Sequence, residues 1–490
     1  MTTTELAEYK LLPTLQYSEL VDSLGKSKTW FGLLNLRDYP ADKFPDAGQI
    51  ADYIFAEIAQ PEIQIFLLLI ERQHDEPWAG NSDSVYIQQL CEIKAQKTNY
   101  NEQYTEIIKR GCVWKNMLPF DNLLGIITQN TDNPLESVAK NRHCVIVNTA
   151  QPLNLEVLNI QKPWGYEGWY TGVEKRGVVR VTDKYGKTEL PHALTLFKKQ
   201  LLADYSIPLI LLKTLNPLAK DVVGDLYYEM HEEKWEVYVV TEIDKTAWPS
   251  GTGIIKAGLH PNKIAEYQQN HAEKWSDVLI EDFKQAIAEY EKIRRLIDES
   301  AEEFSNELSA QEMSLRKKAA DFVGDCPVKV GDIVSFPVFQ LHSLRHGIKV
   351  IEFQTPHYER LIVMFAQKVL TQKHWDTENA LSKILPEVYK QPELEILHKS
   401  DGKLVERFVD FPQFTADRIS LDNEHTWDDL LGRKYHLLIN VSGQAIVFPE
   451  NGQSLFLNPE EALFLPVGMG SYRLKSTGDS PLICLKAMPN

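Results

Sequence analysis

The sequence predicts a mainly β protein: two barrels or sandwiches, a helical insertion and an N-terminal α/β domain. Short β-branched runs alternate with turn residues from His143 to about Pro261, a texture typical of barrel or sandwich strands. Apolar residues then recur at three- and four-residue spacing over 283–297, which is the period of one helix face. Strand-rich segments resume near residue 326 and continue to the end of the chain.

The length of the chain points to several domains, because a single core rarely grows to 490 residues. The boundaries between these domains are predicted where the sequence pattern changes from mixed to strand-rich or helical. The predicted divisions are an N-terminal α/β accessory domain over 1–141, a first barrel over 142–260 and 326–395, a helical insertion over 261–325, and a C-terminal barrel over 396–490.

The N-terminal domain mixes helical and strand signals. The segments "AGQIADYIFAEIA" (47–59) and "DSVYIQQLCEIKAQ" (83–96) carry apolar residues at helical spacing, so we expect two helices. The run "IQIFLLLI" is too short to span a bilayer and reads as a buried strand. No phosphate-binding loop or nucleophile motif is present, and a regulatory or oligomerising role is left open.

The charge balance narrows the classes of partner. Lys and Arg number 52 against 69 Asp and Glu, giving a formal charge of -17. An acidic surface repels nucleic-acid backbones, and an anionic small molecule would need a local basic pocket. The N-terminus has no signal-peptide pattern and the five cysteines show no CxxC spacing. We therefore expect a cytoplasmic protein with reduced thiols and no membrane or nucleic-acid partner.

The stretch "GDLYYEMHEEKWEVYVV" holds residue types that bind metals. Glu229 and His231 share parity on a predicted strand, and a turn through "EEK" would return Glu236 to the same cavity. A fourth candidate is His342, on the strand after the turn in "GDIVSFPVFQLHSL". Two imidazoles and two carboxylates suit zinc, iron, manganese or nickel. The alternative is a hydrogen-bonded, half-buried histidine with Glu229 paired to a lysine.

These two motifs, "ExHx4E" and "Gx5PxxxxH", resemble those of the cupin barrel. More narrowly, the order of "KPWGYE", "PLILLKTLNP", "EMHEEKWEVYVV" and "GIKVIEFQTPHYER" resembles type I phosphomannose isomerase over roughly 142–490. The resemblance implies two cupin-type barrels and a Zn2+ site, or one for another divalent ion, formed by Glu229, His231, Glu236 and His342. Glu229 replaces the family's glutamine, and Phe339 stands where cupins often have glycine.

The resemblance also implies a reaction: mannose 6-phosphate and fructose 6-phosphate, or a related sugar phosphate, interconvert through a cis-enediol. It assigns Glu352 as base or proton shuttle and Arg360 as stabiliser of the enediolate. The family also has a lysine at the position of Lys213, which makes Lys213 the third catalytic candidate; flanked by apolar residues, it should be desolvated unless it reaches a partner. The alternatives are a lysine-paired strand residue for Glu352, a surface ion pair for Arg360, and a structural ion pair for Lys213.

Four further residues are candidates for binding the sugar phosphate. Trp164 and Lys162 belong to "KPWG", which lies near the sugar in the family; Lys256 and Arg345 are basic neighbours of the motifs. Solvent-exposed positions are the alternative for Lys256 and Arg345, and a core position for Trp164. The C-terminal barrel lacks a His-x-His or equivalent in "INVSGQAIVFPENG" and "LFLPVGMGSYRL" and is expected to be structural. The alternative function is a catalytically silent cupin that senses or carries a sugar.

Overall fold

The fold is described from a computed structural model of the chain. The described residues are 15–17, 29–36, 65–75, 84–97, 104–129, 133–174, 177–197, 209–299, 305–369 and 372–490. The helix predicted over 47–59 lies outside them. Within the described residues, no helix combines the length and apolar character needed to cross a membrane.

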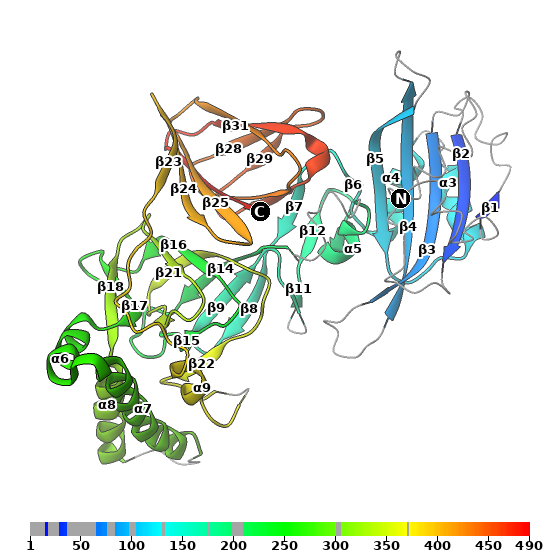
Figure 1. The fold of residues 1–490 in the computed structure, drawn as a ribbon. Helices are drawn as coiled ribbons and strands as arrows, with labels where there is room; N and C mark the ends of the chain where they lie inside the picture. The colour runs from blue at the N-terminus through cyan, green and yellow to red at the C-terminus, as the bar shows by residue number, and fades with distance from the viewer. Residues whose placement is uncertain are drawn as a thin grey trace.

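The N-terminal domain contains a six-stranded sheet with two helices on one face (Figure 1). Its strands, in spatial order, are β1 (Leu15–Tyr17), β2 (Thr29–Leu36), β3 (Ile65–Asp75), β4 (Ser84–Lys97), β5 (Tyr104–Trp114) and β6 (Val147–Asn148). Helices α3 (Phe120–Gln129) and α4 (Pro134–Arg142) pack on it through one apolar cluster. The segment 83–96, predicted as a helix, is instead strand β4, and the predicted buried strand is β3.

The first barrel is built from two facing sheets around a shared apolar core. One sheet has the order β19 (Ile333–Phe336), β16 (Glu236–Ile243), β21 (Ile348–Gln354), β14 (Leu211–Pro217), β9 (Gly165–Trp169) and β8 (Leu158–Lys162). The other has the order β18 (Val323–Val328), β17 (Gly253–Leu259), β20 (His342–Ser343), β15 (Tyr228–Met230) and β22 (Leu361–Met364).

The helical insertion is present as predicted and packs on one end of the first barrel (Figure 1). It consists of α6 (Pro261–His271), the 3-10 turn η5 (Ala272–Lys274), α7 (Trp275–Glu299) and α8 (Asn306–Ala320). The predicted periodic face of α7 is buried at Phe283, Ile287 and Tyr290, within the barrel's own core cluster. The short helix α9 (Thr377–Leu381) lies beside β22.

The C-terminal barrel also has two sheets. The larger has the order β13 (Lys187–Glu189), β12 (Arg180–Thr182), β7 (Leu153–Glu156), β30 (Ala462–Leu465), β27 (His436–Ser442), β32 (Leu482–Pro489), β25 (Phe414–Leu421), β24 (Lys403–Asp410) and β23 (Glu395–Ser400). The smaller has the order β26 (Thr426–Leu430), β31 (Ser471–Ser476), β28 (Ala445–Pro449) and β29 (Leu455–Leu457). Strands β7, β12 and β13 fall in the predicted first-barrel range, yet their hydrogen bonds join them to the C-terminal sheet.

The two barrels pack sheet against sheet through one large apolar cluster. Alternation along each strand sends one set of side chains into this cluster and the other into a barrel interior. On β16, Val237 and Val239 face the cluster, while Tyr238 and Val240 belong to the first barrel's interior. On β21, Phe353 likewise belongs to the cluster, which leaves Glu352 and Gln354 directed into the first barrel.

Candidate active site

Two histidines from distant parts of the chain meet inside the first barrel. Their ring centroids are 5.3 Å apart, and His231 and His342 are 1% and 0% exposed. Strand register explains the meeting, because β15 pairs with β20 so that Glu229 lies directly opposite His342. One ligand atom each from Glu229, His231 and His342 lie within 4.8 Å of one another. The structure therefore gathers three of the four predicted metal ligands at one point.

Glu236, the fourth predicted ligand, begins β16 and is fully buried. Its carboxylate is 3.6 Å from Nε2 of His231 and 2.5 Å from Nε2 of His342. Burial alone would raise the pKa of Glu236, but the ammonium group of Lys234 and the imidazole of His231 hold it well below its usual value. An ionised carboxylate thus lies between the two imidazoles.

Each imidazole is oriented by a backbone carbonyl. His231 Nδ1 lies 3.1 Å from the carbonyl oxygen of Glu359, and His342 Nδ1 lies 2.9 Å from that of Gln340. Nδ1 is the donor in both contacts, which leaves Nε2 as the lone-pair nitrogen on each ring. Both Nε2 atoms are buried and make no aligned hydrogen bond with any described residue. Two orphaned nitrogens facing carboxylates are the donor set a divalent transition metal prefers, so these residues fit such an ion.

The loops that carry the two histidines are tied to each other. The N–H of Phe339 donates to the carbonyl oxygen of His231 at 2.7 Å. Phe339 has φ of +65°, in the left-handed region that glycine adopts freely. The backbone at position 339 therefore adopts a conformation that favours glycine, although phenylalanine occupies the position.

Glu359, which the sequence analysis did not single out, holds the turn after His231. One oxygen of its carboxylate accepts the backbone N–H groups of Glu232, Glu233 and Lys234 at 2.9, 3.0 and 3.1 Å. Its carbonyl orients His231, so Glu359 positions the candidate ligand from two sides. Three donors on a single carboxylate form a rigid anchor for an otherwise irregular turn.

Lys234 was also missed by the sequence analysis. Its Nζ lies 2.6 Å from the Glu236 carboxylate, and the residue is 8% exposed. Burial would lower the pKa of Lys234, but the carboxylates of Glu236 and Glu229 raise it, so the lysine stays charged. Lys234 lies two residues before Glu236, and side chains two residues apart point to the same side of a strand. This spacing is the sequence signal for their proximity.

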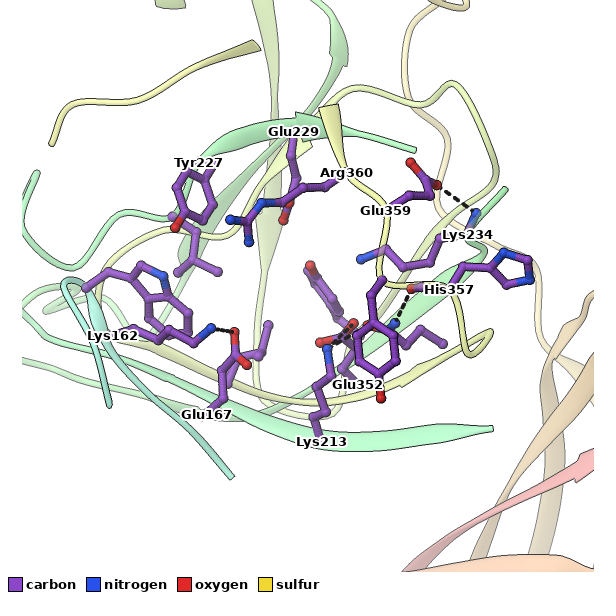
Figure 2. A pocket seen from close by; sticks show the side chains of 16 residues that line it. Lys162, Glu167, Lys213, Tyr227, Glu229, Lys234, Glu352, His357, Glu359 and Arg360 are labelled. Atoms are coloured by element: carbon purple, nitrogen blue, oxygen red, sulfur yellow. Dashed lines mark hydrogen bonds and ion pairs between the residues drawn. The ribbon is translucent and has the colours of Figure 1, made fainter. Parts of the chain in front are cut away.

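A polar pocket opens above the candidate ligands, and sixteen residues line it (Figure 2). Of the four candidate ligands, Glu229 lines the pocket together with Lys234, the ion-pair partner of Glu236, whereas His231, Glu236 and His342 lie beneath the lining. The lining holds equal numbers of positively and negatively charged side chains, four cations and four carboxylates. These are Lys162, Lys213, Lys234, Arg360, Glu167, Glu229, Glu352 and Glu359.

The register of three strands lines up Lys213, Glu352 and Tyr238 on one face of the pocket. Lys213 on β14 and Tyr238 on β16 both lie directly opposite Glu352 on β21. Lys213 Nζ donates to Gln354 Oε1 at 2.8 Å and lies 4.0 Å from Glu352. The predicted catalytic Lys213 and Glu352 therefore share the pocket.

Glu352 has an unusual protonation equilibrium. Burial raises the pKa of the Glu352 carboxyl to about 7, and the negative charge of Glu236 adds to the rise. The positive charge of Lys213 opposes it but is the smaller effect. A carboxyl group that titrates near neutral pH is suited to taking and returning a proton.

The predicted Arg360, Lys162 and Trp164 also line the pocket. The Arg360 guanidinium lies 4.7 Å from the ring centroid of Tyr227 and has no carboxylate partner within the described part of the chain (Figure 2). Lys162 pairs with Glu167 at 3.1 Å. Trp164 is 1% exposed, and its buried Nε1 has no hydrogen-bond partner in the described part of the chain. Arg360 is thus free to hold an anionic group.

Two predicted substrate-binding residues are not brought into this pocket. Lys256 lies opposite Asp325 across β17 and β18 and pairs with it at 2.5 Å. Arg345 pairs with Asp225 and lines a different cavity. Each cation has a carboxylate partner on its own side of the barrel, so neither is retained in the candidate site.

Removing the Lys234 ammonium is expected to destabilise the metal-free protein. Lys234→Met removes the ammonium partner of the buried Glu236 carboxylate, which keeps the hydrogen bond from the Tyr238 hydroxyl at 3.0 Å, and should lower the free energy of unfolding by about 3–5 kcal/mol. Zinc should recover much of that loss by supplying another cation. Urea denaturation with and without zinc measures both effects. Lys383→Met is the control, since Lys383 pairs with Glu232 at a partly exposed position and should cost about 1 kcal/mol or less; equal losses in the two variants would contradict this account of Glu236.

Glu352 is expected to make metal-free stability fall as pH rises. Below pH 4.5, its usual pKa, the group is protonated in both folded and unfolded chains. Between pH 4.5 and about 7 only the unfolded chain loses the proton, so folding becomes less favourable. Relative to Glu352→Gln, the wild type should lose about 2 to 3 kcal/mol from pH 5 to pH 8. Parallel pH profiles of urea unfolding for the two proteins would contradict the raised pKa.

Comparison with known proteins gives matches in structure but not in sequence. No protein-family model matches the chain, and no curated protein matches it in sequence. A substituted variant of phosphomannose isomerase from Salmonella typhimurium superposes with a TM-score of 0.51 at 14% identity, covering 70% of this chain and 100% of that chain. A zinc-bound mannose 6-phosphate isomerase gives 0.50 at 13%, with the same coverage. These similarities establish a shared cupin-type fold.

Proposed function

We propose that the protein is a metal-dependent aldose–ketose isomerase that interconverts mannose 6-phosphate and fructose 6-phosphate. The observation that carries the proposal is the convergence of Glu229, His231 and His342 within 4.8 Å beneath a pocket that contains Glu352. The two solved structures compared above are a phosphomannose isomerase and a zinc-bound mannose 6-phosphate isomerase, which favours this reaction and zinc. A cytoplasmic location fits the five free, buried cysteines.

Glu229, His231, His342 and Glu236 would hold a divalent ion, zinc by preference. Bound there, the ion supplies Lewis-acid stabilisation of charge on the sugar's first two oxygens. Glu352 takes the proton from C2 of the aldose and returns it to C1, while the hydroxyl proton of O2 is transferred to O1, giving the ketose through a cis-enediol. Its pKa of about 7 lets it act in both directions near neutral pH.

The cations of the pocket bind and orient the anionic substrate. Arg360 offers a guanidinium with no carboxylate partner in the described chain, suited to the enediolate oxygens. Lys213 keeps Gln354 and Glu352 in place from β14. Lys162 and Trp164 line the wall where the sugar phosphate would lie.

A catalytically silent sugar-binding cupin is the second candidate. Lys234 favours it, because its ammonium already neutralises Glu236 at 2.6 Å without any metal. Glu229 in place of the family's glutamine adds a further negative charge. In this case the pocket would bind a sugar phosphate and leave it unchanged.

An isomerisation assay separates the two candidates. Zinc-loaded protein is incubated in D2O with mannose 6-phosphate or fructose 6-phosphate, and the products are followed by NMR. We expect interconversion, with solvent deuterium entering at the carbon that receives the proton, and loss of turnover on chelation. Binding of both sugar phosphates by calorimetry without interconversion would support the silent module instead.

A further inference from the structure

A second cavity lies where the helical insertion meets the first barrel. Helix α8 contributes Met313, Arg316 and Lys317, and the barrel side contributes Tyr228, Arg345 and Phe365. It is separate from the pocket above the candidate metal ligands, with Leu226 as the residue that lines both. None of the residues proposed above for metal binding or proton transfer lines this cavity.

The lining of this cavity is net positive. It holds Arg316, Lys317 and Arg345 against one carboxylate, Asp225. Arg345 pairs with Asp225, and Arg316 Nε lies 3.4 Å from Glu312, just outside the lining. Lys317 has no ion-pair partner among the described residues. Even with Glu312 counted, cations outnumber carboxylates, which is unusual on a chain with a formal charge of -17.

Tyr228 presents an unsatisfied polar group to the same space. The residue is 7% exposed and lines the cavity, yet its hydroxyl makes no hydrogen bond within the described chain. Arg345 lies over its ring at 5.5 Å. Among the described residues, Arg316 Nε is buried and makes no aligned hydrogen bond, although it lies 3.4 Å from Glu312. The Tyr228 hydroxyl and Arg316 Nε are therefore two donors that a bound anion could accept from.

Apolar side chains form the remaining wall. Met364 and Phe365 are buried at the base, and Met313 is 61% exposed at the rim of α8. Methionine side chains adapt to flat apolar ligands, and a cavity with cations at one side and apolar walls at the other suits an amphipathic anion.

We propose that this cavity binds a small organic phosphate, with its dianionic head group at Arg316, Lys317 and Tyr228 and an apolar body against Met313 and Phe365. The three cations exceed the neighbouring carboxylates even with Glu312 counted, and Lys317 has no ion-pair partner among the described residues, so an anionic head group is favoured. The position also suits regulation, because Tyr228 precedes the candidate ligand Glu229 on β15 and Arg345 follows His342 by three residues. The binding itself does not depend on the isomerase reaction.

Isothermal titration calorimetry with phenyl phosphate tests the proposal. We expect saturable binding by the zinc-loaded full chain, with Kd raised about tenfold in Lys317→Ala and several-fold in Tyr228→Phe. Lys318→Ala is the matched control, because the next residue of α8 pairs with Glu289 and does not line the cavity. Circular dichroism and metal content establish that each variant is folded.

Arg360→Ala distinguishes the two pockets. Phenyl phosphate should bind this variant as it binds the wild type, and a crystal soaked with phenyl phosphate should show the phosphate beside Arg316. The proposal is overturned if phenyl phosphate does not bind. It is equally overturned if Lys317→Ala and Tyr228→Phe bind normally, or if only Arg360→Ala loses binding.

Discussion

His231→Ala is expected to lose the bound metal and to lower isomerase turnover by about a thousandfold. The Nε2 atom of His231 is one of two buried imidazole nitrogens that face Glu229 and Glu236 without an aligned hydrogen bond. Removing it leaves the donor set one strong ligand short, and metal affinity falls accordingly. His342→Ala should behave in the same way, since its Nε2 completes the pair.

Elemental analysis and the isomerisation assay on the same preparations measure these effects. The wild type should carry about one zinc per chain, and both alanine variants should carry little. His374→Ala is the control, because the His374 side chain is 83% exposed and outside the cluster. Retention of metal and turnover by His231→Ala would remove the basis for a metal centre at this position.

Glu352→Gln is expected to lower kcat by about 10²- to 10⁴-fold while leaving zinc content unchanged. The substitution keeps the shape of a side chain that is 3% exposed and removes its capacity to carry a proton between C2 and C1. Substrate binding should change little, because Arg360 and Lys162 remain in the pocket.

Hydrogen exchange at the sugar separates a proton-transfer role from a structural one. Glu352→Gln should fold, bind zinc and bind mannose 6-phosphate, yet fail to exchange the C2 hydrogen with D2O. Glu378→Gln serves as the control, since that carboxylate is 83% exposed and pairs with Lys284 away from the pocket. Normal exchange in Glu352→Gln would assign the base to another group.

The convergence of Glu229, His231 and His342 could be predicted from sequence because short-range periodicity and motif spacing both point to it. Glu229 and His231 are separated by one residue, and the distant His342 follows a recognisable turn. Lys234 and Glu359 could not be assigned in the same way. Their roles depend on a turn whose three N–H groups converge on one carboxylate more than a hundred residues later.

Strand β4 illustrates how periodicity can mislead. Leu90 packs toward α3 and α4, whereas Ile87 and Cys91 join the cluster on the other face of the sheet. Burial on both faces removes the apolar–polar alternation of a half-exposed strand, and the remaining spacing matches a helix. The pairing of β4 with β3 and β5 is what distinguishes a strand from a helix in this segment.

Lys256 and Arg345 illustrate a different limit. Both are basic residues close in sequence to the motifs, but their carboxylate partners, Asp325 and Asp225, come from neighbouring elements. Which face a strand residue presents depends on register, and register is fixed by long-range pairing that a single sequence does not display.

An anomalous difference map recorded at the zinc absorption edge from zinc-loaded crystals tests the central claim most directly. The account predicts one strong peak between the Nε2 atoms of His231 and His342, in contact with a carboxylate oxygen of Glu229. Absence of a peak there would contradict it. So would a peak only at the other carboxylate–histidine group on the barrel, Asp221, Asp225 and His346.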